Sequence, residues 1–111
     1  MATTAERRGH KYGAVKTTTR GIQFDSKAES DRYVELVMLQ KAGEITGLQV
    51  QTPWPLGVNG THVAEYVADF TYYTRSGRFV VEDVKGVRTP VYRLKAKMFA
   101  AQYGLTITET S

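Results

Sequence analysis

Two strand-forming runs on either side of a short turn constrain the fold of this chain most. Residues 63–73 and 78–85 are rich in β-branched and aromatic side chains, and the turn-forming residues Arg75, Ser76 and Gly77 lie between them. This pattern is typical of two antiparallel strands joined by a turn. The sequence therefore predicts a β-hairpin centred near Ser76.

The N-terminal part of the sequence predicts an arm and one helix. Residues 1–20 are small, polar and basic and lack a hydrophobic period, which predicts a flexible basic arm followed by a single domain over residues 21–111. Ser26 and Glu29 have the spacing of a capping box, so we expect a helix to begin there. Gly43 is placed to end it.

A short strand before the hairpin and a helix after it complete the pattern. Pro53 and Pro55 restrict the stretch before the hairpin to a sheet edge or an irregular path. Thr89 is typical of an N-cap and Gly104 of a C-terminal glycine, and a last strand is expected over residues 105–108. The fold class is thus α+β or α/β, with helix, three strands, helix and strand around a mixed central sheet. The residues of the second helix expected to face the core are Val91, Leu94, Met98 and Ala101.

Composition narrows the class of protein. The chain has 111 residues, enough for one domain, and no cysteine, which excludes disulfides and thiolate metal sites. No apolar run approaches the roughly 18 residues of a membrane span, so we expect a cytoplasmic protein. The net charge is +4, and basic and acidic residues are segregated along the sequence. This segregation suits a protein that binds a polyanion and a cation, although a solvated surface with a basic tail also explains it.

Two acids interrupt the strand runs of the hairpin. Strand side chains alternate between faces, so Asp83 and Lys85 share one face. Asp69 and Asp83 each lie about seven residues from Ser76, so antiparallel pairing would place their carboxylates nearly opposite each other. A divalent cation such as Mg²⁺ or Mn²⁺ would offset their repulsion, and such a site polarises a phosphodiester and activates water. Lys85 could assist the water or neutralise charge in the transition state.

Asp69 together with Asp83, Val84 and Lys85 resembles the signature of PD-(D/E)xK nucleases. Residue 68 is alanine where the pattern has proline, as in many members. Over residues 11–109 the chain resembles small phage-type endonucleases of this superfamily, including relatives of Holliday-junction resolvases and endonuclease I-like proteins. The segments that carry the resemblance are residues 24–29, 48–51, 66–70, 81–86 and 92–99.

The resemblance implies a restriction-endonuclease-like core and metal-dependent endonucleolytic hydrolysis of DNA, leaving a 5′-phosphate and a 3′-hydroxyl. Asp69 and Asp83 would bind the metal directly, Val84 would bind it through its carbonyl, and Lys85 would be the catalytic lysine. Glu29 would be an additional acid for metal or water binding, although helix capping alone also explains it. A branched or junction substrate, a homodimer and, for a phage protein, the host cytoplasm are further expectations.

Several residues are candidates for contacts with DNA, and several have simpler explanations. Lys95 ranks first because it lies close to the expected buried stripe, while the other helical cations could be solvated. Glu82 is expected on the opposite face from Asp83, and Lys85 could protect a strand edge. The rival functions are a catalytically inactive DNA-binding accessory protein and a nuclease acting on RNA. The candidate DNA contacts are Lys16, Arg20, Gln51, Arg88, Arg93, Lys95 and Lys97.

Overall fold

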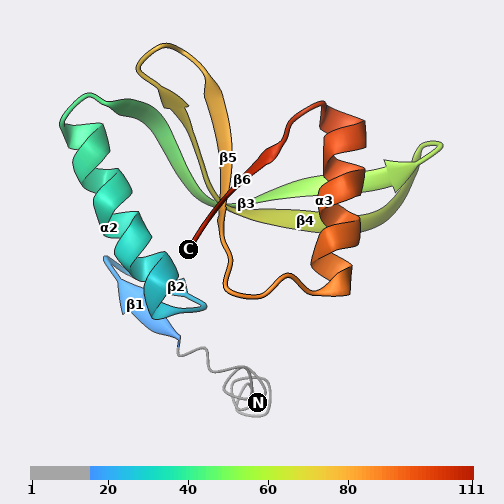
Figure 1. Cartoon of the computed structure of the whole chain (residues 1–111), viewed down its shortest axis with the longest axis horizontal. Coiled ribbons are helices and arrows are strands. Elements are labelled where there is room, and N and C mark those ends of the chain that lie inside the picture. The colour runs from blue at the N-terminus through green and yellow to red at the C-terminus, as the bar shows by residue number, and fades with distance from the viewer. Residues whose placement is uncertain (1–15) are drawn as a thin grey trace. The chain divides into compact units, whose positions relative to one another are not determined.

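The computed structural model describes residues 16–111, and contacts divide the chain into two compact units, residues 1–35 and 36–111. The helix α2 (Lys27–Lys41) contains the boundary between them. The remaining elements, in chain order, are β1 (Thr17–Thr19), β2 (Ile22–Phe24), β3 (Ile45–Val58), β4 (Thr61–Thr74), β5 (Phe79–Val84), α3 (Pro90–Tyr103) and β6 (Ile107–Thr110) (Figure 1).

The first unit begins with a small hairpin that the sequence reasoning missed. β1 and β2 pair antiparallel across Arg20 and Gly21, whose φ angles are 53° and 82°. Two successive residues with positive φ are typical of the tight turns that join hairpin strands. The predicted arm was therefore wrong for residues 17–19, because three β-branched threonines extend into a strand there. Residues 1–15 of that arm lie outside the described residues.

Helix α2 starts where the capping signal placed it. The Glu29 N–H donates to Ser26 Oγ at 3.2 Å, which confirms the serine half of the capping box. Glu29 itself is buried. Within the same unit the rings of Phe24 and Tyr33 lie 5.2 Å apart. Gly43, with φ of 81°, follows the helix end as expected.

The second unit contains a four-stranded sheet in the order β3-β4-β5-β6. The first two pairings are antiparallel and β5 pairs parallel with β6, which confirms an α+β fold with a mixed sheet. β3 is one continuous strand on the edge of this sheet, with Pro53 and Pro55 inside it. The hairpin of β3 and β4 turns at Asn59 and Gly60 and extends past α3 (Figure 1). β6 begins two residues later than the sequence predicted.

Helix α3 covers one face of the β3–β4 hairpin. It begins after Thr89, whose Oγ1 accepts from the Tyr92 N–H at 3.1 Å, and ends at Gly104 with φ of 69°. Tyr92 and Phe99 are the buried residues of the helix. They belong to a core cluster whose other members are Leu56, Tyr66, Ala68 and Val81.

The core-facing stripe of α3 differs from the predicted one. Val91 and Leu94 are 62% and 60% exposed and Ala101 is exposed too, so the prediction that these three face the core was wrong. Met98 is half-buried and packs against the core cluster, as predicted. Two apolar stripes overlap on this helix, and the one carrying the larger aromatic rings is buried because an aromatic side chain removes more apolar area from water. Among residues 16–111, no helix is long and apolar enough to cross a membrane.

Candidate active site

The two hairpin acids lie where β4 and β5 separate. The ladder between these strands runs from Tyr73 opposite Phe79 to Phe70 opposite Glu82. One step further the same register places Asp69 opposite Asp83, as the sequence predicted. At this position side-chain carboxylates take the place of backbone carbonyls as hydrogen-bond acceptors. Asp83 Oδ1 accepts from the Asp69 N–H at 3.0 Å. In turn, Asp69 Oδ2 accepts from the Val84 N–H at 2.8 Å.

The Asp83 carboxylate is 0% exposed. Its Oδ2 accepts a hydrogen bond from the Tyr66 O–H at 2.6 Å and lies 3.8 Å from Lys85 Nζ. A buried carboxylate is costly unless it is hydrogen-bonded and paired, and these neighbours provide both. Burial raises the pKa of the Tyr66 hydroxyl, and the hydrogen bond to Asp83 raises it further. Tyr66 is therefore held in the protonated, donating state.

Lys85 is held on the same face as Asp83, in agreement with the alternation of β5. Its Nζ lies 4.2 Å from the centroid of the Tyr92 ring, a cation–π distance. Its backbone N–H donates to Thr110 O at 2.7 Å, which ties this end of β5 to β6. The side chain remains 27% exposed.

A third acid stands beside the pair, and sequence reasoning missed it. The parallel register of β5 and β6 pairs Asp83 with Glu109. Glu109 accepts hydrogen bonds from Arg88 Nε at 2.6 Å and from the Tyr92 O–H at 2.8 Å. These two donors, Arg88 first, lower the pKa of Glu109. The last strand was expected to stop at residue 108, and continuing its alternation by two residues would have included Glu109.

Two hollows flank Lys85. The larger, of about 660 Å³, is lined by Lys85, Arg88, Arg93 and Glu109 among others. The smaller, of about 270 Å³, includes Lys85, Tyr66 and Lys95. Three of the predicted DNA contacts, Arg88, Arg93 and Lys95, are thus brought beside the predicted catalytic lysine.

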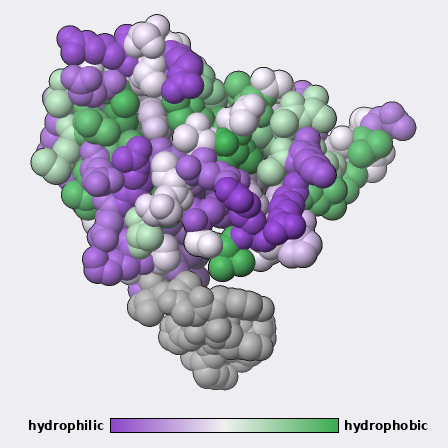
Figure 2. All heavy atoms as spheres, viewed as in Figure 1, coloured by the Kyte–Doolittle hydropathy of each residue, from purple (hydrophilic) through white to green (hydrophobic). Residues whose placement is uncertain are grey.

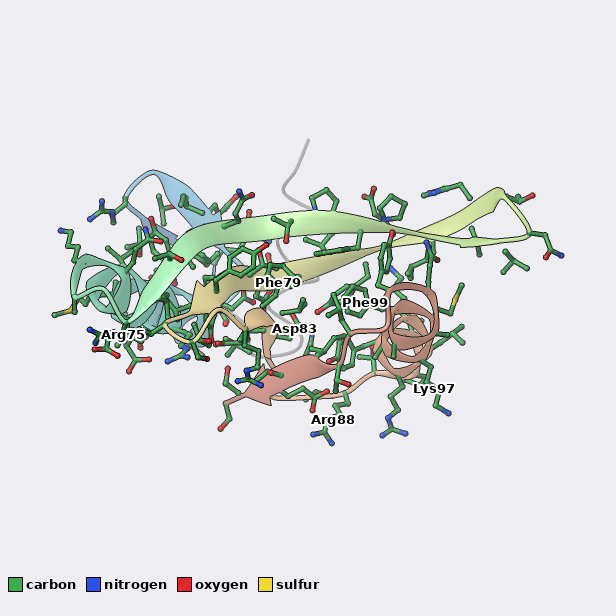
Figure 3. The ribbon with its side chains drawn as sticks, turned by 90° about the horizontal axis from the view of Figure 1, so that it is seen from above. Arg75, Phe79, Asp83, Arg88, Lys97 and Phe99 are labelled. Carbon is green, nitrogen blue, oxygen red and sulfur yellow. The ribbon has the colours of Figure 1, made fainter. Side chains whose placement is uncertain are left out.

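The cations of α3 and the preceding loop face one side of the second unit. Figure 3 shows Arg88 and Lys97 pointing in the same direction, away from the β3–β4 hairpin. Figure 2 views the molecule from that side, and hydrophilic side chains gather over α3 and β6. Arg93 and Lys97 are both exposed. This face therefore presents positive charge next to the acids.

The other predicted residues belong partly to the second unit and partly to the first. Glu82 is 0% exposed and accepts from the Tyr72 O–H at 2.6 Å, so its partners differ from those of Asp83, as alternation predicted. Gln51 has a φ of 53° and lies between two β3–β4 ladder pairs whose register places it opposite Asp69. The predicted site residues that belong to the first unit are Glu29, Lys16 and Arg20, and Lys16 pairs there with Asp25 at 3.1 Å.

The oxygen atoms at the point where β4 and β5 separate are suitable ligands for a hard divalent cation. Among residues 16–111, no three His, Cys, Asp or Glu side chains converge into a metal-binding group. Mg²⁺, however, is commonly held by one or two carboxylates, with waters and substrate phosphates completing its shell. Asp69 and Asp83 supply the carboxylates. The Val84 N–H donates to Asp69, so it lies on the β4 side of β5. In an extended residue the carbonyl lies on the same strand edge as the N–H, so the Val84 carbonyl oxygen also faces Asp69.

Comparison with known proteins gives a family match for this chain. A family model described as protein of unknown function (DUF1064) matches residues 9–109. No curated protein and no solved structure matches the chain. The matched region contains the whole candidate site, from Asp69 to Glu109.

Proposed function

The chain belongs to the DUF1064 family of proteins of unknown function, and from its site we propose that it is a divalent-metal-dependent DNA endonuclease of the PD-(D/E)xK type. One observation carries this proposal. Asp69 and Asp83 meet where β4 and β5 separate, and Lys85 extends from the same face of β5. Two carboxylates and an accessible lysine beside a hollow lined by cations are suited to phosphodiester hydrolysis.

Each residue of the site has a separate proposed role. Asp69, Asp83 and the Val84 carbonyl would hold Mg²⁺ or Mn²⁺, which supplies polarisation of the phosphodiester and a lowered pKa of water. Lys85, as an ammonium group, neutralises negative charge that develops on the attacked phosphate, and it can orient the attacking water by donating a hydrogen bond to its oxygen. Tyr66 keeps the Asp83 carboxylate in place through its 2.6 Å hydrogen bond. Glu29 stays a proposed additional acid.

The exposed cations of the α3 face would bind the phosphate backbone of DNA. Contacts of this kind carry no sequence information and weaken steeply with salt, because each releases condensed counterions. We include Lys95 and Lys97 in this surface, together with Arg88 and Arg93. Lys16, Arg20 and Gln51 stay predicted DNA contacts. A restriction-endonuclease-like core, a branched or junction substrate, a homodimer and a cytoplasmic location also stay predictions.

A catalytically inactive DNA-binding protein is the second candidate, and one observation favours it. Both oxygens of the buried Asp83 accept hydrogen bonds, and Asp69 satisfies the Val84 N–H. Closing the end of a sheet ladder is thus a sufficient structural reason for both acids. An RNA nuclease differs from the main proposal only in substrate, so the same experiment separates all three.

The test measures both binding and cleavage of supercoiled plasmid, a four-way DNA junction and a single-stranded RNA, each with Mg²⁺, Mn²⁺ or EDTA. Asp69→Asn and Lys85→Ala are compared with the controls Asp31→Asn and Lys41→Ala, which alter exposed residues of α2. We expect metal-dependent DNA cutting that falls about 100-fold or more in the site variants and is unchanged in the controls. Circular dichroism checks that every variant is folded.

Each contrary outcome points to one rival. DNA binding without cutting under any metal would contradict the endonuclease proposal and support the accessory protein. Cleavage of RNA without cleavage of DNA would support the RNA nuclease. Cutting that survives both site substitutions would show that the activity does not come from this site.

A further inference from the structure

The larger hollow beside Lys85 contains an ion pair that hydrolysis does not require. Arg88 is 61% exposed there and binds Glu109 through Nε at 2.6 Å. Three cations and one acid line the hollow, namely Lys85, Arg88, Arg93 and Glu109. Its charged side chains thus carry a formal excess of positive charge with Glu109 ionised.

The chemistry of these groups favours an anion with several oxygens. A guanidinium group presents a planar fork of donors that matches a phosphate, and two arginines line this hollow. An exposed Arg–Glu pair contributes little to stability, so a phosphate can displace the carboxylate from Arg88. Glu109 then keeps a partner, because the Tyr92 O–H donates to its other oxygen at 2.8 Å.

We propose that this hollow is a second phosphate subsite, in which Arg88 exchanges Glu109 for a phosphate group of the nucleic acid next to the one under attack. The inference rests on the proposed function and deepens it. A substrate that fills both positions has at least two linked phosphates, which a nucleic acid chain supplies and a small ester with one phosphate does not. The second phosphate is either an internal diester or a terminal 5′-phosphate.

The test measures DNA binding in EDTA, so it does not depend on cleavage. The probe is a labelled DNA duplex, prepared with and without 5′-phosphates. Arg88→Gln and Glu109→Gln are compared with Arg75→Gln and Glu44→Gln. Arg75 and Glu44 form a matched control pair, since they are an exposed Arg–Glu ion pair with an N–O distance of 3.3 Å that does not line the hollow.

We expect Arg88→Gln to weaken binding about tenfold and Arg75→Gln to change it far less. Glu109→Gln should tighten binding several-fold, and by more than Glu44→Gln, because it releases Arg88 as well as removing a negative charge. An Arg88 effect that needs the 5′-phosphate identifies a terminal phosphate, and an effect on both duplexes identifies an internal diester.

Two outcomes would overturn the subsite. The first is equal weakening by Arg88→Gln and Arg75→Gln, and the second is equal tightening by Glu109→Gln and Glu44→Gln. If either occurs while the wild type still cuts DNA, the subsite is wrong and the endonuclease proposal stands. If wild type neither binds nor cuts DNA, both are wrong.

Discussion

Replacing Tyr66 by phenylalanine removes one hydroxyl group and tests how Asp83 is held. The Tyr66 O–H donates to the carboxylate of the buried Asp83, so bulk water does not compensate for the loss of this hydrogen bond. The ring itself keeps its packing against Phe99, with centroids 5.1 Å apart. The substitution therefore removes a hydrogen bond without opening a large cavity.

The size of the effect follows from the charge on the acceptor. A hydrogen bond to a charged group contributes roughly 1.5–3 kcal/mol, so we expect Tyr66→Phe to lower the free energy of unfolding by about 2 kcal/mol. In a domain of this size that lowers the melting temperature by about 8 °C. Tyr72→Phe is the matched control, because the Tyr72 O–H also donates to a buried carboxylate, that of Glu82, at 2.6 Å. In EDTA the two variants should lose similar stability.

Addition of Mg²⁺ or Mn²⁺ should separate the two variants. Of these two tyrosines, Tyr66 is the one whose hydroxyl occupies Asp83 Oδ2, so the metal should raise the melting temperature of Tyr66→Phe more than that of wild type or Tyr72→Phe. Thermal unfolding is followed by circular dichroism in EDTA and in each metal. An unchanged melting temperature of Tyr66→Phe in EDTA would refute the reasoning about the buried hydrogen bond. Identical responses of both variants to metal would refute a cation at Asp83.

Three further predictions concern α3, β6 and assembly. Thr89→Ala removes the acceptor for the Tyr92 N–H and should lower the free energy of unfolding, measured in urea, by about 1 kcal/mol. Thr89→Ser keeps a hydroxyl acceptor and should retain most of that stability. Arg88 and Tyr92 lower the pKa of Glu109, so its stabilisation is present above its ordinary pKa of 4.5 and is lost as the pH falls through the lower, folded value. Glu109→Gln should slightly flatten the pH dependence of the urea midpoint in that acidic range, by no more than about 1 kcal/mol in the free energy of unfolding, because the pair is partly exposed. A pH dependence identical to that of wild type would contradict the lowered pKa of Glu109. Light scattering should show a dimer with DNA, and a monomer with and without DNA would end that prediction.

Local signals predicted most of the second unit. The hairpin register followed from the symmetry of the strand runs about Ser76, and it correctly placed Asp69 opposite Asp83. Helix α3 begins after Thr89 and ends at Gly104, as expected, because helix caps form hydrogen bonds with backbone groups close in sequence. These features depend on residues close in sequence, which is why one sequence was sufficient to find them.

Features that depend on distant residues were missed. No turn sets the register of the parallel β5–β6 pair, so Glu109 could not be placed beside Asp83. Tyr66 lies three residues before Asp69, and strict alternation puts their side chains on opposite faces. Its contact with Asp83 arises beyond the Phe70–Glu82 pair, where the ladder between β4 and β5 ends.

The prolines of β3 have a consequence for how the protein behaves at high concentration. Pro53 and Pro55 are two residues apart, so their nitrogen atoms face the same edge of the strand, and proline is tolerated where that edge is not the paired one. Two successive donor positions are thus removed from the outer side of β3, the terminal strand of the four-stranded sheet. A foreign strand that approaches there finds no N–H group at either position. The long hairpin is therefore protected against edge-to-edge aggregation along its middle.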